Sequence, residues 1–334
     1  MPKKIVLFVT FVCWSLQSFA QEAGFNIDFL GYADNREYKL PYTTPKTIFG
    51  TRISPDLYFK MGKNHTVHGG IHIGQDFGEK EHDNPTIRPI IYYNYRNTNF
   101  DFSIGHIPRY DIMKNTPRAI LSDTLFYYRP NIEGMVLAYK NSNFNQKLFI
   151  DWTSKQSETD REQFFVGTNG KIKLGNFYFS DDIVMWHNAL SSNDSIEQHI
   201  QDNGTAMFKL GADLSHKTIM DSLTVDAGVL IGMDRIRSEY DFRFPKGLIA
   251  TIYMAYRKFS LENTFYSGQR QNTPYADSYY RSKTYNRLDL GWSPFKSSHI
   301  EGVFKIALHF TPGEIANQQT FTLRYLFSRP FFKK

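Results

Sequence analysis

Alternation of apolar and polar residues is the dominant pattern along this chain after residue 24. In Phe321–Phe327, the residues Phe, Leu, Tyr and Phe share one face of an extended chain, while Thr and Arg point to the other. Segments 206–214, 223–231 and 300–308 repeat the pattern. A period of two residues is typical of strands whose two faces meet different surroundings. The pattern therefore predicts a chain of two-faced strands with almost no helix.

Marking every such segment gives about 16 strands, within a range of 14 to 18. The predicted strands are 25–34, 48–60, 65–76, 87–96, 98–106, 131–140, 144–153, 162–173, 176–187, 204–215, 222–233, 247–256, 258–268, 284–293, 298–310 and 319–328. Short and long connections alternate between them, with long ones at 35–47, 77–86, 107–130, 154–161, 188–203, 234–246, 269–283 and 311–318.

This arrangement of strands and loops predicts an all-β fold, a single closed antiparallel transmembrane β-barrel. Hydrocarbon cannot solvate unpaired backbone groups, so a sheet that crosses a membrane must close on itself. Bacterial outer-membrane barrels have an even number of antiparallel strands, short periplasmic turns and long extracellular loops. No apolar run after residue 20 reaches the roughly 20 residues that a membrane-spanning helix needs.

The first twenty residues have the composition of a secretory signal peptide. Lys3 and Lys4 precede the apolar run Ile5–Leu16, and Ser18 and Ala20 are the small residues of a cleavage site. We expect cleavage before Gln21. The predicted organisation is a cleaved signal peptide at 1–20, a barrel at 21–328 and a short basic tail at 329–334.

Composition narrows the class of protein further. Aromatic residues make up 16% of the chain, and many lie near predicted strand ends, where amphipathic rings favour the lipid headgroup region. The one cysteine, Cys13, belongs to the signal segment, so no disulfide scaffold is expected. The net charge is +6, of which Lys3 and Lys4 contribute two, leaving about +4. That weak bias gives no reason to expect a nucleic-acid partner.

With these features the chain resembles the porins of Gram-negative outer membranes over its whole mature length. In that family the last strand carries an assembly signal of alternating apolar residues that ends in Phe. Phe321, Leu323, Tyr325 and Phe327 match it here, and the tail after Phe327 departs from it. The resemblance implies integral insertion in the outer membrane among lipid and lipopolysaccharide, recognition by the barrel assembly machinery, and a homotrimer.

The longest connection, 107–130, is the third long loop. In sixteen-stranded porins the third outer loop folds into the barrel and sets the narrowest point of the pore. We therefore expect a charged constriction here, the alternative being a surface loop that covers the mouth. Its candidate residues are Arg109, Asp111, Lys114, Arg118, Asp123 and Arg129.

Strand parity also predicts which charged residues line the wall of the lumen. They are Arg52, Asp56, Lys60, Asp101, Lys209, Asp213, Asp226, Arg287, Asp289, Lys305 and Arg324. Since both signs are well represented, we expect many cross-strand ion pairs and a weakly selective pore.

The sequence gives little sign of metal or enzyme chemistry. His68 and His72 are four residues apart on a strand, about 13 Å, too far to bind one ion. The acidic residues Asp76, Glu79, Glu81 and Asp83 form a loop that could hold a divalent cation or simply be solvated. His187, with Asp181 and Asp182 nearby, has no nucleophile beside it. We expect no cofactor, no metal and no catalytic residue.

These observations lead us to expect a porin-like channel for passive diffusion of small hydrophilic solutes, and not an enzyme. A plugged barrel that serves as a scaffold or as part of a surface complex is the alternative. An outer-membrane lipid hydrolase is the third interpretation.

Overall fold

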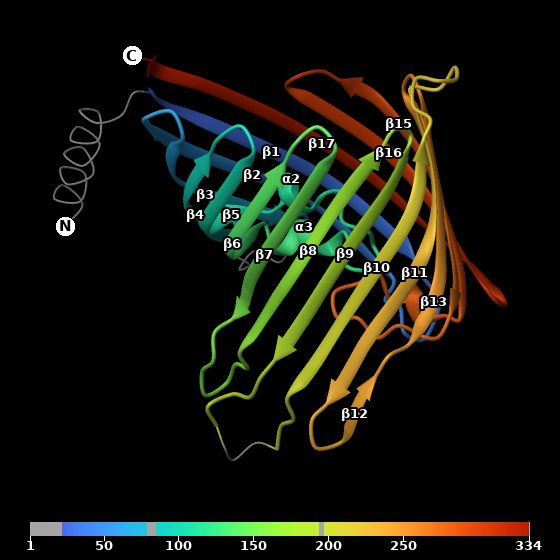
Figure 1. Ribbon diagram of the computed structural model, residues 1–334. Coiled ribbons are helices and arrows are strands. Elements are labelled where there is room, and N and C mark those ends of the chain that lie inside the picture. The colour runs from blue at the N-terminus through green and yellow to red at the C-terminus, as the bar shows by residue number, and fades with distance from the viewer. Residues whose placement is uncertain (1–21, 79–84, 194–196, 334) are drawn as a thin grey trace.

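The computed structural model describes residues 22–78, 85–193 and 197–333. It is a closed antiparallel barrel whose wall has sixteen strands, as the sequence predicts. Figure 1 shows the strands side by side around a lumen that contains two short helices. The expected signal peptide lies outside the described residues.

The strands are β1 Glu22–Glu37, β2 Lys46–Met61, β3 His65–Asp76, β4 Thr86–Arg96, β5 Phe100–Pro108, β6 Asn131–Lys140, β7 Phe144–Ser154, β8 Gln163–Leu174, β9 Phe177–Asn188, β10 Gln201–Asp213, β11 Ser222–Ile236, β12 Tyr240–Arg243, β13 Lys246–Tyr256, β14 Phe259–Gly268, β15 Thr284–Lys296, β16 Ile300–Thr311 and β17 Glu314–Lys333. The helical elements are α2 Tyr110–Met113, α3 Thr124–Tyr128 and the single 3₁₀ turn η1 Ser278–Arg281. Strand β12 is a short addition within the loop 237–245, beside β11, and does not belong to the wall.

Pairing between the first and the last strand closes the barrel. β1 pairs with β17 from Glu22↔Lys333 to Glu37↔Asn317 and pairs with β2 on its other edge. Every wall strand thus has two neighbours, which gives its backbone groups partners within the sheet.

Two details at the C-terminal hairpin differ from the prediction. Residues 329–333, expected as a tail, continue β17 and pair with β1. The expected long loop at 311–318 is only the turn Pro312-Gly313, in which Gly313 has φ +82°, a conformation that favours glycine. The alternation pattern ended too early because Pro330 and a register shift at Ala23/Gly24 interrupt it.

Alternate residues of each wall strand face outward and inward. Along β2 the outward residues Ile53 and Leu57 are exposed, while Arg52 and Ser54 are buried on the lumen side. This parity is what a wall between lipid and a polar lumen requires. Among the described residues, no helix is long and apolar enough to cross a membrane.

We predict that deleting residues 329–334 weakens barrel closure, because the deletion removes one end of the β1–β17 ladder. The truncated protein should lose its heat-modifiable, SDS-resistant band at a lower temperature than the full chain. An identical melting temperature on semi-native gels would show that these residues are a dispensable tail.

Candidate functional site

Loop L3, residues 109–130, lies inside the barrel with both of its helices, α2 and α3 (Figure 1). Its apolar residues Met113, Ile120 and Leu125 are buried in one cluster with Phe149 and Phe165 of the wall. The main hydrophobic core of this protein is therefore in the lumen, between the third loop and the strands.

A buried ion pair anchors L3 to the wall. Arg109 is 1% exposed, and its Nη2 donates to Asp151 on β7 at 2.5 Å and to the carbonyl oxygen of Asn131 at 2.5 Å. Its Nε donates to the carbonyl oxygen of Arg129. The second carboxylate oxygen of Asp151 accepts from the backbone N–H of Glu133. These bonds give both charges the partners that burial demands.

A second inward loop, L7 (269–283), meets L3 across the lumen. The N–H of Ser122 donates to the carbonyl of Tyr275, and the N–H of Asp277 donates to the carbonyl of Arg118. Arg287 on β15 bonds both Asp289 and Asp277, at 2.7 and 3.2 Å. The two loops and these charges therefore meet inside the lumen, toward the end of the barrel where the long loops lie.

Two carboxyl groups on these loops have opposite pKa shifts. Hydrogen bonds from Arg324, with a smaller contribution from Lys114 and against the effect of burial, lower the pKa of Asp111 to about 2. Burial raises the pKa of Asp277, although Arg287 opposes the shift. The Asp111 contact with the wall therefore persists in moderate acid and is lost as the pH falls through about 2.

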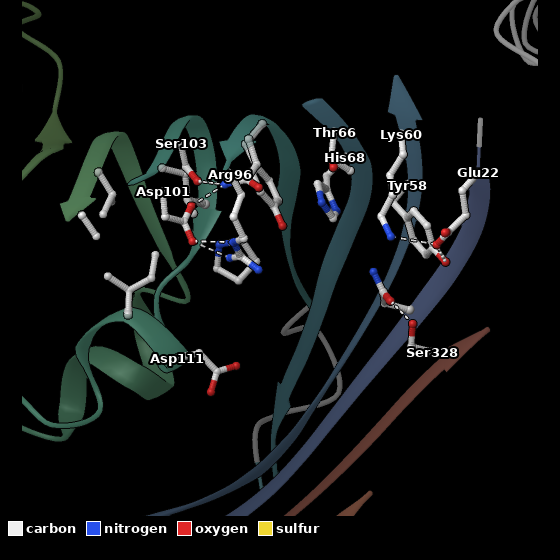
Figure 2. Close-up of a pocket in the computed structure, with 18 of the residues that line it drawn as sticks. Glu22, Tyr58, Lys60, Thr66, His68, Arg96, Asp101, Ser103, Asp111 and Ser328 are labelled. Atoms are coloured by element: carbon white, nitrogen blue, oxygen red, sulfur yellow. Dashed lines mark hydrogen bonds and ion pairs between the residues drawn. The ribbon is translucent and has the colours of Figure 1, made fainter. Parts of the chain in front are cut away.

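On the side of L3 toward the short turns, the lumen is hollow. A cavity of about 740 Å³ is lined by Tyr58, Lys60, His68 and Asp101, and Figure 2 shows Asp111 projecting toward it from α2. A second cavity of about 440 Å³ shares Asp111, Ile112 and Lys147 with the first. We call this space the vestibule.

The candidate constriction residues do not share one environment: some are buried against the wall and others face the vestibule. Arg109 is sealed between L3 and the wall, whereas Asp111 faces the vestibule and bonds Arg324 and the exposed Lys114. Arg118 pairs with Asp123, and Arg129 donates to the carbonyl of Thr153. Arg109 therefore cannot act as a free charge in an aqueous pore.

The predicted wall charges are mostly paired with other side chains. The pairs are Asp56 with His68, Lys60 with Glu22, Asp101 with Arg96, Lys209 with Asp226, Asp213 with Lys173, Arg287 with Asp289, and Arg324 with Asp28. Lys305 lies near Asp289 and Asp123. Arg52 Nη1 donates a hydrogen bond to the carbonyl oxygen of Phe126 at 2.7 Å.

The predicted assembly residues lie on β17, where Phe321 stacks on Phe304 and Phe327 contacts Phe25.

Three buried side chains form a hydrogen-bonded chain that the sequence analysis missed. Ser54 Oγ lies 2.7 Å from His72 Nδ1, and His72 Nε2 lies 2.8 Å from Asn131 Oδ1. Ser54 is 5% exposed, and the other two are 4% exposed. Ser54 lies opposite His72 because Ile53 pairs with Ile73 and Asp56 with Gly70. Asn131, where L3 returns to the wall, completes the chain.

The bonds of Asn131 fix the roles of the histidine nitrogens. Asn131 Nδ2 donates to the carbonyl of Pro89 at 2.6 Å, so Oδ1 is the atom that faces His72. His72 Nε2 must then carry the proton, which leaves Nδ1 free to accept the Ser54 hydroxyl proton. A serine, a base and an orienting group in hydrogen-bond contact are the components of an activated nucleophile.

A cavity of about 290 Å³ adjoins this chain, between strands β1 to β4 and α3. His72, Arg52, Arg88, Tyr127 and Tyr128 contribute to its lining. Arg88 on β4 lies directly opposite His72, and Arg52 shares the inward face of β2 with Ser54. The lining of this cavity thus includes two cations, Arg52 and Arg88, together with the carboxylate of Asp76.

The other candidate histidines have different environments. His68 bonds Asp56 at 2.9 Å, stacks on Tyr92 and faces the vestibule. His187 bonds Asp202 on β10 at 2.8 Å. In the part of the chain that the structure describes, no group of three His, Cys, Asp or Glu side chains could hold a metal. Of the acidic loop, Asp76 accepts from the Tyr32 hydroxyl, and 79–84 lie outside the described residues.

We predict that Asp151→Ala lowers the free energy of unfolding by about 3–5 kcal/mol, because it leaves Arg109 buried without its counter-charge. Urea titration of the refolded protein in lipid vesicles, followed by tryptophan fluorescence, measures the change. Glu314→Ala, which breaks an exposed pair with Lys39, should cost no more than about 1 kcal/mol. Equal costs for both variants would contradict the anchoring role of Arg109.

Solved structures of porin fold are similar to this chain. A loop L8 deletion mutant of OmpT from Vibrio cholerae has a TM-score of 0.55 and 11% identity, over 91% of this chain and 99% of that one. OccK5 (OpdH) of Pseudomonas aeruginosa has a TM-score of 0.55 and 8% identity, over 94% of this chain and 99% of that one. OccK2 (OpdF) of the same species, in complex with glucuronate, has a TM-score of 0.54 and 9% identity, over 93% of this chain and 99% of that one. These likenesses establish the barrel fold.

A search among curated protein sequences finds no match. The sequence profile of the Lipid A 3′-O-deacylase-type family matches residues 16–333. Our expectation that the chain is not an enzyme is therefore wrong, since this family is named for an enzyme activity. Because the match spans nearly all of the sequence, the chain belongs to the Lipid A 3′-O-deacylase-type family.

Proposed function

We propose that this protein is an outer-membrane acyl hydrolase that removes an ester-linked acyl chain from a phosphorylated lipid of the lipid A class. The observation that carries the proposal is the hydrogen-bonded chain Ser54–His72–Asn131. Membership of a family named for lipid A deacylation supports the substrate class.

In the proposed reaction Ser54 Oγ attacks the ester carbonyl and its proton passes to His72 Nδ1. The same proton then goes to the departing sugar oxygen, which leaves as a hydroxyl, while the acyl group stays on Ser54. Water, deprotonated by His72, attacks the acyl-serine ester and releases the fatty acid. Asn131 holds the imidazole in the required tautomer throughout, because its Oδ1 accepts from Nε2.

Two arginines supply the electrostatics of the proposed site. Arg52 is buried beside Ser54, and Arg88 lies across from His72. A phosphate on the lipid headgroup would neutralise one guanidinium on binding. A cation beside the serine also stabilises the negative charge that forms on the ester oxygen during attack.

We predict that Ser54→Ala and His72→Ala each lower the rate of fatty-acid release from lipid A by about 10³-fold or more. Asn131→Ala should lower it by about 10-fold to 100-fold, since the base remains but loses its orientation. The assay is mass spectrometry of lipid A incubated with the purified protein in detergent.

Two matched variants control for nonspecific effects on the fold. His68→Ala removes the other lumen histidine on the same face of β3, and Ser180→Ala removes a buried serine that lines the vestibule. Both should retain hydrolysis. Full activity in folded Ser54→Ala or His72→Ala protein would refute the proposed nucleophile and base.

Diffusion of small hydrophilic solutes is a second candidate function, with L3 as the constriction. The observation that favours it is the position of α2 inside the barrel, directly above the vestibule. The two functions can coexist in one barrel, because the proposed catalytic cavity and the vestibule share no lining residue.

Deleting residues 111–123 should raise single-channel conductance in planar bilayers, because the deletion removes α2 from the lumen. Deleting 157–160, at the extracellular end of β7, is the control and should leave conductance unchanged. Unchanged conductance in the 111–123 deletion would remove L3 as the constriction.

A further inference from the structure

The outer wall of the barrel carries a charged cluster near the extracellular ends of β9, β10 and β11. We call it the rim cluster; it consists of His187, Asp202, Arg235 and Arg237. The first three are register neighbours across the strands, with His187 opposite Asp202 and Asp202 opposite Arg235.

Their neighbours in sequence show that these residues face outward. Asn203 donates to Asp234 and to the carbonyl of Asn272 in the inward loop L7, so those two side chains point into the lumen. Trp186 likewise contacts Tyr275 of L7. His187, Asp202 and Arg235 occupy the alternate positions and therefore face away from the lumen.

One carboxylate orients three donors in this cluster. Arg235 donates through Nε and Nη2 to Asp202, at 3.0 and 2.5 Å, and Arg237 donates through Nε at 2.9 Å. His187 Nδ1 lies 2.8 Å from the same carboxylate. Asp202 neutralises only one of the two guanidinium charges, so the rim cluster keeps a net positive charge.

Each arginine also keeps part of its hydrogen-bonding capacity. Within the described residues, the side-chain bonds of Arg235 and Arg237 use Nε and Nη2 and leave Nη1 without a protein partner. Arg237 is also 46% exposed at its side chain. Two guanidinium groups held side by side with free donors match the oxygens of a phosphate group.

Aromatic side chains flank the cluster on both sides. On one side, Trp152 stacks on Phe164, and Phe164 contacts the His187 ring. On the other side, Phe242 of β12 lies against the Arg235 guanidinium at 3.9 Å. Trp152 is 40% exposed. Exposed rings beside cationic groups are typical of the level where acyl chains meet lipid headgroups.

We propose that the rim cluster binds the phosphorylated headgroup of an outer-leaflet lipid, with Arg235 and Arg237 on the phosphate and the acyl chains against Trp152 and Phe164. Charge complementarity selects this occupant, since the patch is cationic, faces lipid and has apolar rings next to it. The site lies on β7–β12, away from the cavity at β1–β4, so it is distinct from the proposed catalytic cavity.

The test is native mass spectrometry of the full protein in detergent with diphosphorylated lipid A. Every variant carries Ser54→Ala, so the result does not depend on the proposed hydrolysis. We expect Arg235→Glu/Arg237→Glu to bind the lipid at least about 10-fold more weakly. Arg281→Glu/Lys283→Glu makes the same charge change at exposed positions on L7 and should bind as the parent does.

Two further arms distinguish the source of the phosphate and the role of the rings. Inorganic phosphate at the same concentration should not displace the lipid, and Trp152→Ala should weaken binding severalfold. Heat-modifiable migration on gels verifies that each variant is folded. Unchanged lipid binding in the Arg235/Arg237 variant, equal loss in the Arg281/Lys283 control, or displacement by inorganic phosphate would overturn the proposal.

Discussion

Pairing of β1 with β17 is the contact on which the rest of this structure depends, because hydrocarbon offers no partner to the backbone groups of an open sheet edge. Closure requires an even number of antiparallel wall strands and gives every strand one face toward lipid and one toward the lumen. It also encloses a space that wall side chains alone cannot fill, since barrels of this size leave a wide interior. The loops that enter this space determine what the protein can do.

The lumen of the barrel contains both an apolar cluster and buried ion pairs. L3 supplies apolar residues to a buried cluster, and the Arg109–Asp151 pair fixes the loop to β7. Arg287 and its carboxylates connect the wall to L7. The filled lumen retains the vestibule and, apart from it, a smaller cavity lined by His72.

Much of the fold was predictable from the sequence, because strand periodicity and the spacing of turns are local signals. The C-terminal strand was misjudged because a proline and a register shift mask its alternation. The buried partner of Arg109 could not have been predicted, because the contact joins a loop to a wall strand 42 residues away. The sequence pattern led us to expect Arg109 at the charged constriction of the pore, whereas the structure buries it against Asp151.

The Ser54–His72 contact was within reach of sequence reasoning. The strands predicted at 48–60 and 65–76 are joined by a short connection around residue 63. Both residues lie nine positions from residue 63, so the hairpin brings them face to face. The wrong expectation that the chain is not an enzyme rested on the absence of a nucleophile beside His187, and a pair formed across two strands lies outside that pattern. Asn131 needed the structure, because it joins the pair from the end of L3.

The central proposal is that Ser54 is an activated nucleophile inside the barrel. Treating the folded protein with a fluorophosphonate, which reacts covalently with activated serines, and mapping the adduct by tandem mass spectrometry tests it directly. The account predicts one modified residue, Ser54, and loss of labelling when the barrel is unfolded by heat. An unmodified Ser54 in the folded protein, or an adduct on another serine, would contradict it.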